Sequence, residues 1–459
     1  MLAAIAETGD GLPLGARLAL PWAIPFVGLL LTIALAPLVA PRAWHHHYGK
    51  IAAGWGVLFA LPFLLVYRGE ALHEILHILL GEYVAFLAIL FGLFTVSGGI
   101  AVRGTLRGSP GFNTLVMVIG MFLASFVGTT GASMLLIRPL LRANRHRRSC
   151  VHIVVFFIFL VSNIGGGLTP LGDPPLFLGF LQGVPFFWTV GKMFLPMALS
   201  AVLLLTAFHL VDRRAAKLDP LPPKNVEDTG VSIGGLRNLW LLLGIVAAVL
   251  LSGIWKSGTV PVLGVDLKIA GLVRDALIVC CGLISLKITA RAIRTENGFN
   301  WGPMREVSKL FAAIFVTIVP ALAILQAGEQ GALKSLVSSV ETPAQFFWAS
   351  GLLSSFLDNA PTYLAFFSVA IGKFSPGVDY ATAVHALTTD HALYLEAISA
   401  GAVFMGANTY IGNAPNFMVK AIAEEAGVKM PSFFGYILRW TLPFLIPVFL
   451  IDTLLFRLM

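Results

Sequence analysis

Apolar stretches of about 20 residues follow one another along this sequence and limit its possible folds more than any other feature. A helix of about 20 apolar residues matches the hydrocarbon core of a bilayer, roughly 30 Å thick. The chain has 57% hydrophobic and 12% charged residues. In soluble domains about a quarter of the residues are charged, so this composition is not that of a soluble domain. The sequence predicts an all-α polytopic membrane protein. The expected crossings are 21–41, 51–67, 83–102, 150–168, 185–210, 236–255, 270–289, 307–327, 391–411 and 432–456.

Two further apolar segments are interrupted at mid-length by small and polar residues. Residues 112–141 are broken at Gly-Thr-Thr-Gly (128–131), and residues 343–371 are broken at Asp-Asn-Ala-Pro-Thr (358–362). Each half is about 12 residues long, which is too short to cross a bilayer. Non-helical backbone at membrane depth is tolerated only inside protein or beside a water-filled cavity. We therefore expect two re-entrant helical hairpins with polar tips, within about 10–12 membrane segments in total.

A twelve-residue pattern occurs twice. The sequence "GGLTPLGDPPLF" at 166–177 aligns without gaps with "GANTYIGNAPNF" at 406–417, at an offset of 240 residues. Both copies place Gly, Pro and polar residues inside apolar runs, where Pro removes a helical hydrogen bond and breaks the helix. The sequence therefore predicts two discontinuous transmembrane helices, at about 150–182 and about 391–425.

The two hairpins align as well, because Ser125-Phe126 matches Ser355-Phe356. We expect an N-terminal segment at 1–20, a first repeat at 21–211, a polar linker at 212–235 and a second repeat at 236–459. Each repeat contains five crossings and one hairpin, and this odd number inserts the second repeat upside down. The first residues lack the basic region and the continuous apolar core of a cleavable signal peptide, so we expect no removed leader.

The distribution of basic residues agrees with this inverted arrangement. If residues 42–50 face the cytoplasm, the loops on that side hold 20 Lys and Arg, and the opposite loops hold five. Cytoplasmic loops of membrane proteins carry such an excess. The formal charge of +8 therefore reports orientation, and we expect a lipid bilayer as partner and no nucleic acid. The expected location is the plasma membrane, or the inner membrane of a bacterium.

Inverted repeats with broken helices are typical of secondary transporters, whose substrate sites lie near the midplane at the repeat interface. Hard cations prefer oxygen ligands, and half-helix N-termini favour anions. The sequence permits a cation or a carboxylate as substrate. Oxygen-bearing side chains near the breaks are Thr129, Thr130, Ser162, Asn163, Asn359 and Thr362.

Asp173 and Asp358 favour the cation. An ionised carboxylate at membrane depth is costly, and such residues mark ion and proton pathways. If a proton and Na⁺ compete for these carboxylates, binding of one expels the other, and antiport follows. In the alternative interpretation both residues cap helices, because "Asp-Pro-Pro" and "Asp-Asn-Ala-Pro" suit a helix start. The two roles are compatible.

Other ionisable residues receive ordinary interpretations. Arg138 follows the first hairpin, and we expect it to extend to the cytoplasm rather than neutralise a substrate. Arg274 and Asp275 are expected to pair with each other. The three histidines at 45–47 are expected in a solvated loop.

Three segments resemble a known group of proteins. "SNIGGGLTPLGDPPLFLGFL", "FLDNAPTYLAFF" and "GANTYIGNAPNF" are similar to signature segments of the ion-transporter superfamily, especially its NhaD-type sodium/proton antiporters and the related citrate-transport group. The resemblance covers both repeats. It implies a helical inverted-repeat transporter, often a homodimer, whose hairpins reach a central site.

The resemblance also implies an ion site. It places the site at Asp358, Asn359, Thr362, Ser162, Asn163, Thr169 and Asp173, with Asn408, Thr409 and Asn413 as repeat partners. It implies sodium at Asp358, Asn359, Asp173 and Asn163. Carboxylate carriers of the superfamily are similar in using Ser-Asn-Thr at their tips, whereas the tips here read Gly128-Thr129-Thr130 and Asp358.

We therefore expect a sodium (or lithium)/proton antiporter, with no cofactor besides the transported Na⁺ and H⁺. The alternative is sodium- or proton-coupled transport of citrate or another carboxylate, because a Na⁺ beside Asp358 would screen its charge. An enzyme embedded in the membrane would need a nucleophile with a base or a metal cluster, and the sequence shows neither pattern.

Overall fold

Helices dominate the residues that the computed structural model describes, which are 13–104, 106–219, 230 and 232–458. Among these residues, eight helices are long and apolar enough to cross a membrane. The prediction of an all-α polytopic membrane protein is confirmed. The strands form two small antiparallel pairs, β1 (Ala101–Arg103) with β2 (Ser232–Gly234) and β3 (Thr259–Val262) with β4 (Val265–Lys268).

The first half of the chain ends with a long helix that runs into the expected linker. Its helices are α1 (Leu14–Arg17), α2 (Ile24–Val39), α3 (Pro41–Ile78), α4 (Val84–Ser97), α5 (Pro110–Val127), α6 (Thr129–Ala143), α7 (Val151–Leu160), α8 (Pro174–Leu181) and α9 (Phe186–Ala216). Helix α9 continues to Ala216, past the expected start of the linker at 212. Residues 220–229 and 231 of that linker, and 1–12 of the N-terminal segment, lie outside the described part.

Helix α3 corrects a second expectation. It includes residues 42–50, so the histidines at 45–47 belong to a helix and not to a loop. Arg68, with φ 46° and ψ −115°, kinks α3 and separates the expected crossing at 51–67 from the residues that lead through a π-helical turn (Leu79–Tyr83) into α4.

The second half, like the first, contains a pair of helices joined at a break and then a broken helix. Its helices are α10 (Arg237–Ile254), α11 (Ile269–Ile288), α12 (Arg291–Glu296), α13 (Gly302–Gln326), α14 (Lys334–Ser339), α15 (Pro343–Phe356), α16 (Asn359–Phe374), α17 (Tyr380–Thr389), α18 (Ala392–Phe404), α19 (Ala414–Glu425), α20 (Phe433–Tyr436) and α21 (Ile446–Leu458). The inverted orientation of the two repeats stays a prediction.

Each expected hairpin is a pair of packed helices joined at a break. Helices α5 and α6 meet at Gly128, whose φ of 82° favours glycine, and α15 and α16 meet at Leu357 and Asp358. Their lengths are 18, 15, 14 and 16 residues, so the expected length of about 12 was wrong. Because α5 alone is long enough to span a membrane, the re-entrant course of the hairpins stays a prediction.

The two discontinuous helices have the same construction. Helix α7 is followed by a 3-10 turn (Ile164–Gly167) and an extended segment before α8, and α18 is followed by a 3-10 turn (Met405–Asn408) before α19. A Cβ on Gly172 would lie 2.2 Å from the carbonyl oxygen of Gly166, and a Cβ on Gly412 would lie 2.6 Å from that of Gly406. Each break therefore requires glycine at a close backbone approach.

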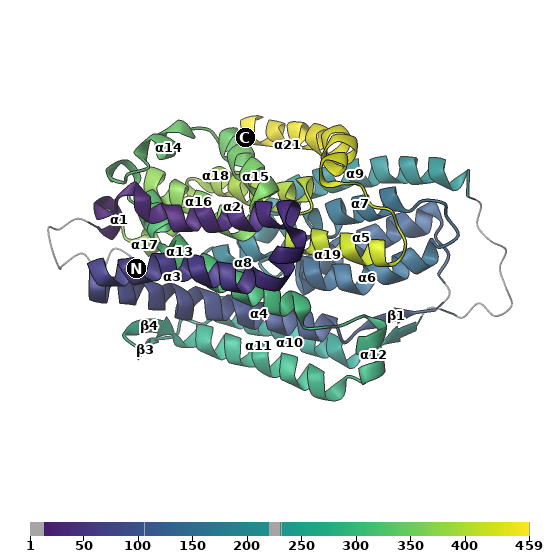
Figure 1. The fold of residues 1–459 in the computed structure, drawn as a ribbon, viewed down its shortest axis with the longest axis horizontal. Helices are drawn as coiled ribbons and strands as arrows, with labels where there is room; N and C mark the ends of the chain where they lie inside the picture. The colour runs from purple at the N-terminus through teal and green to yellow at the C-terminus, as the bar shows by residue number, and fades with distance from the viewer. Residues whose placement is uncertain (1–12, 105, 220–229, 231, 459) are drawn as a thin grey trace.

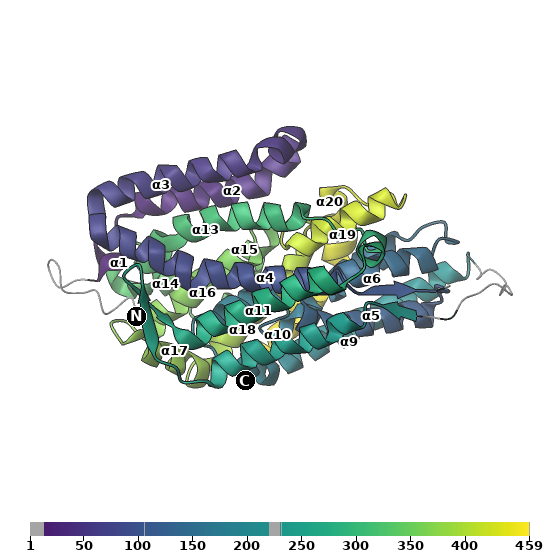
Figure 2. The same ribbon diagram turned by 90° about the horizontal axis from the view of Figure 1, so that it is seen from below.

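The hairpins approach the middle of the molecule from opposite ends. Figure 1 places α5 and α6 toward the end that carries β1, and α14, α16 and α17 toward the end that carries β3 and β4. Figure 2 shows α2 and α3 along one edge and α9 along the opposite edge. Between these edges, α7 is buried from His152 to Leu160, so the broken helices lie in the core next to the hairpin tips.

Candidate ion site at the four chain breaks

The carboxylate of Asp173 receives hydrogen bonds from three elements. Thr129 Oγ1 on α6 donates to Oδ1 at 2.8 Å, and Asn413 Nδ2 before α19 donates to the same oxygen at 3.1 Å. Asn359 Nδ2 on α16 donates to Oδ2. Asp173 is 2% exposed. Four breaks that lie far apart in the sequence therefore meet at one buried carboxylate.

Local backbone geometry directs Asp173 away from its own helix. The residue is extended, with φ −143° and ψ 145°, and its side chain makes no capping bond to α8, which starts with Pro174. The first hairpin is held beside it, because Thr129 N donates to the carbonyl oxygen of Gly172 at 2.8 Å. Helix capping therefore does not explain Asp173.

Asp358 behaves differently from Asp173. Its carboxylate accepts a hydrogen bond from Ala360 N at 3.1 Å and caps α16, and the residue is half-buried. Thr362 Oγ1 donates to the backbone oxygen of Asp358 at 2.9 Å. The capping interpretation thus holds for Asp358, and Thr362 bonds within its own helix.

Two amide oxygens near the second hairpin tip are buried without a hydrogen-bond partner in the described structure. They are Oδ1 of Asn359, which is fully buried, and Oδ1 of Asn408, which is 5% exposed. The amide nitrogen of Asn408 donates to Ser355 Oγ at 2.9 Å, which leaves its oxygen free to accept. Buried polar groups are usually paired, and these two oxygens are acceptors that no described protein donor uses.

These oxygens suit a hard monovalent cation better than a transition metal. In the described residues, no group of three or more His, Cys, Asp or Glu could hold a metal ion. Sodium does not need such a group, because amide, carbonyl and carboxylate oxygens are the ligands that hard cations prefer.

Asn163 joins the two broken helices to each other. Its Nδ2 donates to Asn416 Oδ1 at 2.7 Å, and its Oδ1 accepts from Asn413 Nδ2 at 3.3 Å. Asn416 in turn donates to the carbonyl oxygens of Gly406 and Thr409, at 2.8 and 2.9 Å. The expected sodium ligand Asn163 therefore has protein partners on both ends of its amide.

Thr169 and Thr409 tie each broken helix to the hairpin of its own half. Thr169 Oγ1 donates to the carbonyl oxygen of Ser125, and Thr409 Oγ1 donates to that of Ser355. Each hydroxyl also accepts a backbone N–H two residues later, at 3.1 and 3.2 Å. The same contacts recur in both halves, with the threonines 240 residues apart and the serines 230 apart, so both threonines position the breaks rather than contact Asp173.

The remaining expected residues lie close by but make other contacts. Ser162 Oγ is 2.8 Å from Ser133 Oγ, and both side chains are fully buried. Thr130 is half-buried and lines the pocket beside Asp173. Sequence reasoning missed Asn416 and Ser133 as members of the network. Asn416 stood inside the repeated pattern, whereas no local signal marked Ser133.

A pocket with room of about 100 Å³ opens beside Asp173. Its walls come from α4, from the first turns of α13, from the first hairpin tip and from the starts of α8 and α19. The lining residues include Phe86, Leu93, Phe94, Thr129, Thr130, Asp173, Phe177, Met304, Val307 and Met418. Among the described residues that line it, none is Lys, Arg or His. Of these described lining residues, Asp173 alone carries a formal charge.

The two carboxylates differ from the buried Asp212 in having no cationic partner among the described residues. Neither Asp173 nor Asp358 belongs to an ion pair there. Arg138 donates to the carbonyl oxygen of Asn297 at 2.8 Å. Arg274 pairs with Asp275 at 2.7 Å, as expected.

A helical membrane protein whose chain breaks converge on a buried polar site has the construction of secondary transporters. The chain belongs to the family described as "Putative citrate transport", whose model matches residues 15–457. Of the two groups that the sequence resembles, family membership supports the citrate-transport group and not the NhaD-type antiporters specifically. Membership also implies a role in transport rather than in catalysis. A comparison with curated proteins found no match.

Proposed function

We propose that this protein exchanges Na⁺ (or Li⁺) for H⁺, with Asp173 as the residue that both ions share. The observation that carries the proposal is a buried carboxylate held by neutral donors, one of which, Asn359, keeps an unpartnered amide oxygen. A multivalent anion would need positive charge, and the pocket wall supplies none from its described residues. A cation, in contrast, would be attracted by the carboxylate and the amide oxygens and would meet no positive charge among these residues.

Competition supplies the coupling in this proposal. Ionised Asp173 and the free oxygens of Asn359 and Asn408 attract a cation, and protonation removes the charge that attracts it. The capping carboxylate of Asp358 adds negative charge at the second hairpin tip. Binding of one ion therefore lowers the affinity for the other at any pH where both compete.

Everted membrane vesicles that contain the protein test the exchange. Added Na⁺ is expected to collapse a preformed pH gradient, and Asp173→Asn is expected to abolish this response while the protein still folds. Asp358→Asn keeps an N-cap, so it tests the charge alone, and we expect weaker Na⁺ binding. Asp379→Asn is the matched control, because Asp379 caps the exposed start of α17. Normal exchange by Asp173→Asn contradicts the proposal.

The second candidate is sodium- or proton-coupled uptake of citrate, and the family description favours it. Proteoliposomes with an inward Na⁺ or H⁺ gradient would then accumulate labelled citrate. If citrate accumulates and Na⁺ alone moves no protons, carboxylate transport replaces the antiport proposal. If Na⁺ moves protons without citrate, antiport stands.

We further propose a plasma-membrane location, or the inner membrane in a bacterium, and a homodimer. Mass determination of the purified protein in detergent tests the assembly. A mass of twice 49.2 kDa, after subtraction of detergent, supports the dimer, and a mass of 49.2 kDa contradicts it.

A further inference from the structure

A second cavity, of about 770 Å³, lies apart from the ion site. It is bounded by the last turns of α6, the segment 144–151, Glu296 at the end of α12 and the end of α19 with residues 426–429. We name it the arginine vestibule. Its charged lining residues are Arg138, Arg142, Arg145, Arg147, Arg148, Lys429, Glu296 and Glu425.

Several of these cations are already paired. Arg142 Nη1 lies 4.0 Å from Glu296, and Arg148 Nε lies 3.3 Å from Asp219. Arg145 and Lys429 are exposed, and neither has an ion-pair partner among the described residues. Glu425 also lines the vestibule, is exposed and has no ion-pair partner among the described residues, so it offsets one of these two positive charges and an excess of positive charge remains.

Arg147 contributes a buried donor to the wall of the vestibule. Its side chain is 1% exposed, and its Nη1 donates to Asp212. Its Nη2 donates to the carbonyl oxygen of Gly108 at 2.7 Å. Its Nε has no partner among the described atoms. Asp212 and Gly108 therefore fix this guanidinium in the wall, and its Nε is buried away from the open space of the vestibule.

Membrane orientation explains an excess of basic residues on this side, but not their arrangement. Residues that only report orientation extend toward water or headgroups. Here five arginines line one concavity, and one of them is buried. Guanidinium groups bind phosphate and carboxylate oxygens in pairs of hydrogen bonds, and concave basic surfaces concentrate anions.

We propose that the arginine vestibule binds a multivalent phosphate anion, with the exposed Arg145 and Lys429, unpaired among the described residues, as its contacts. Inorganic pyrophosphate and an anionic phospholipid headgroup share this chemistry. The site is separate from the pocket at Asp173, so the proposal does not depend on the transported ion.

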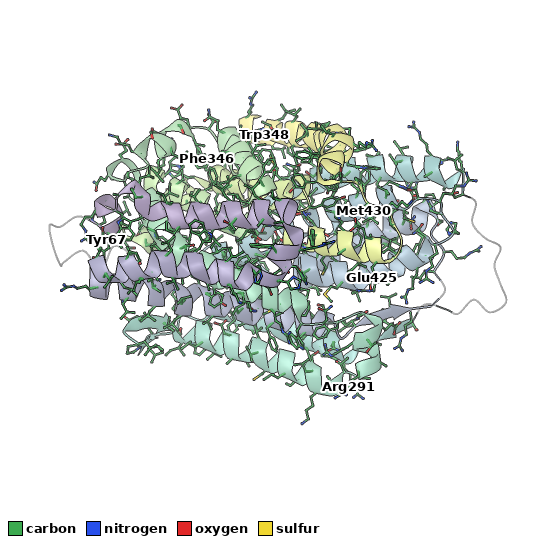
Figure 3. All side chains as sticks on the ribbon, in the orientation of Figure 1. Tyr67, Arg291, Phe346, Trp348, Glu425 and Met430 are labelled. Atoms are coloured by element: carbon green, nitrogen blue, oxygen red, sulfur yellow. The ribbon has the colours of Figure 1, made fainter. Side chains whose placement is uncertain are left out.

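Binding of pyrophosphate to the full-length protein tests the site directly. The protein is placed in nanodiscs of phosphatidylcholine, and pyrophosphate is titrated by calorimetry at constant ionic strength. We expect saturable binding, and a loss of affinity of about tenfold or more in the double variant Arg145→Gln/Lys429→Gln, because charge-assisted hydrogen bonds are lost. Arg291→Gln is the control, since Arg291 is exposed, projects from the edge of the molecule (Figure 3) and does not line the vestibule.

A second arm distinguishes the two sources of phosphate. Nanodiscs that contain phosphatidylglycerol are compared with phosphatidylcholine nanodiscs by thermal unfolding. A higher unfolding midpoint in the wild type and Arg291→Gln, but not in the double variant, assigns the site to a headgroup. Pyrophosphate binding to the wild type and Arg291→Gln, but not to the double variant, assigns the site to a soluble anion. If neither arm responds, or if the double variant responds like the wild type, the vestibule is not a phosphate site.

Discussion

At the scale of single residues, the candidate site depends on how each polar atom is used. Asp173 accepts from Thr129, Asn359 and Asn413, and these donors leave the amide oxygen of Asn359 without a partner. Thr169 uses its hydroxyl to hold backbone. Residues of similar chemistry near one another in the sequence therefore have different roles.

Thr129 and Thr130 provide a direct comparison of two such neighbours. Thr129→Val removes a donor to Asp173, and we expect the cation affinity to change by about 1–3 kcal/mol, roughly 5- to 150-fold. Thr130→Val keeps the three hydrogen bonds to Asp173, so a smaller change is expected. Na⁺ titration of exchange in vesicles measures both. Equal effects of the two variants would show that the hydrogen bond to Asp173 does not tune the site.

Asp212 and Asp452 are another informative pair, separated by the repeat offset of 240 residues. Asp212 is fully buried and accepts from Arg147, from His152 at 2.9 Å and from Asn113 at 2.8 Å. Asp452 is also fully buried, but it accepts from Ser200, and its Oδ1 has no described partner.

Because Asp212→Asn leaves Arg147 buried without a carboxylate, we expect a loss of about 3–5 kcal/mol of stability. Asp452→Asn keeps an acceptor for Ser200, so we expect a change below about 1.5 kcal/mol. Thermal unfolding of the detergent-purified variants measures both. Similar losses in the two variants would mean that the ion pair with Arg147 adds nothing.

At the scale of elements, glycine contacts define the breaks. Gly172 approaches Gly166 too closely for a Cβ, and Gly172 also accepts the hydrogen bond that holds Thr129. The same close approach occurs between Gly412 and Gly406. The position of Thr129 beside Asp173 therefore depends on the backbone of the break as well as on the side-chain hydrogen bond.

Gly172→Ala is expected to shift the backbone and cost about 1–3 kcal/mol, because the added Cβ would overlap the Gly166 oxygen. Gly412→Ala is expected to act in the same direction. In Gly191→Ala on α9, the added Cβ would meet nothing within 4 Å, so that variant is the control. Thermal unfolding and Na⁺-dependent exchange are the measurements. Unchanged stability and exchange in Gly172→Ala would mean that the break tolerates a side chain.

At the scale of the whole molecule, the orientation of the two ends can be tested. Strand β4 precedes α11 and α12 follows it, and a helix of 20 residues is about 30 Å long, so these segments lie at opposite ends (Figure 1). The basic-residue bias places α12 in the cytoplasm.

In a background without Cys150, Cys280 and Cys281, Asp266→Cys is expected to react with an impermeant maleimide in intact cells. Arg291→Cys is expected to react only after permeabilisation. Both positions are exposed, so access to reagent decides the outcome. The reverse pattern would contradict the predicted orientation.

The sequence by itself determined the class of fold and the positions of the breaks. Helices that cross a bilayer need long apolar runs, and interruptions within them are visible as Gly, Pro and polar residues. The expected broken helices at about 150–182 and 391–425 agree with α7–α8 and α18–α19 for this reason. The hairpin lengths were wrong, because polar tips mark where a helix stops and not how far it extends.

Only the tertiary structure decided which of the candidate oxygens are free. Asn163 bonds to Asn416, 253 positions away, and Asp173 bonds to Asn359, 186 positions away. Such partners leave no trace in local sequence, so Asp173 and Asp358 looked equivalent until one was found in a network and the other at a cap. The physical reason is that a hydrogen bond needs a donor and an acceptor in contact, and packing between segments far apart in the sequence decides which atoms meet.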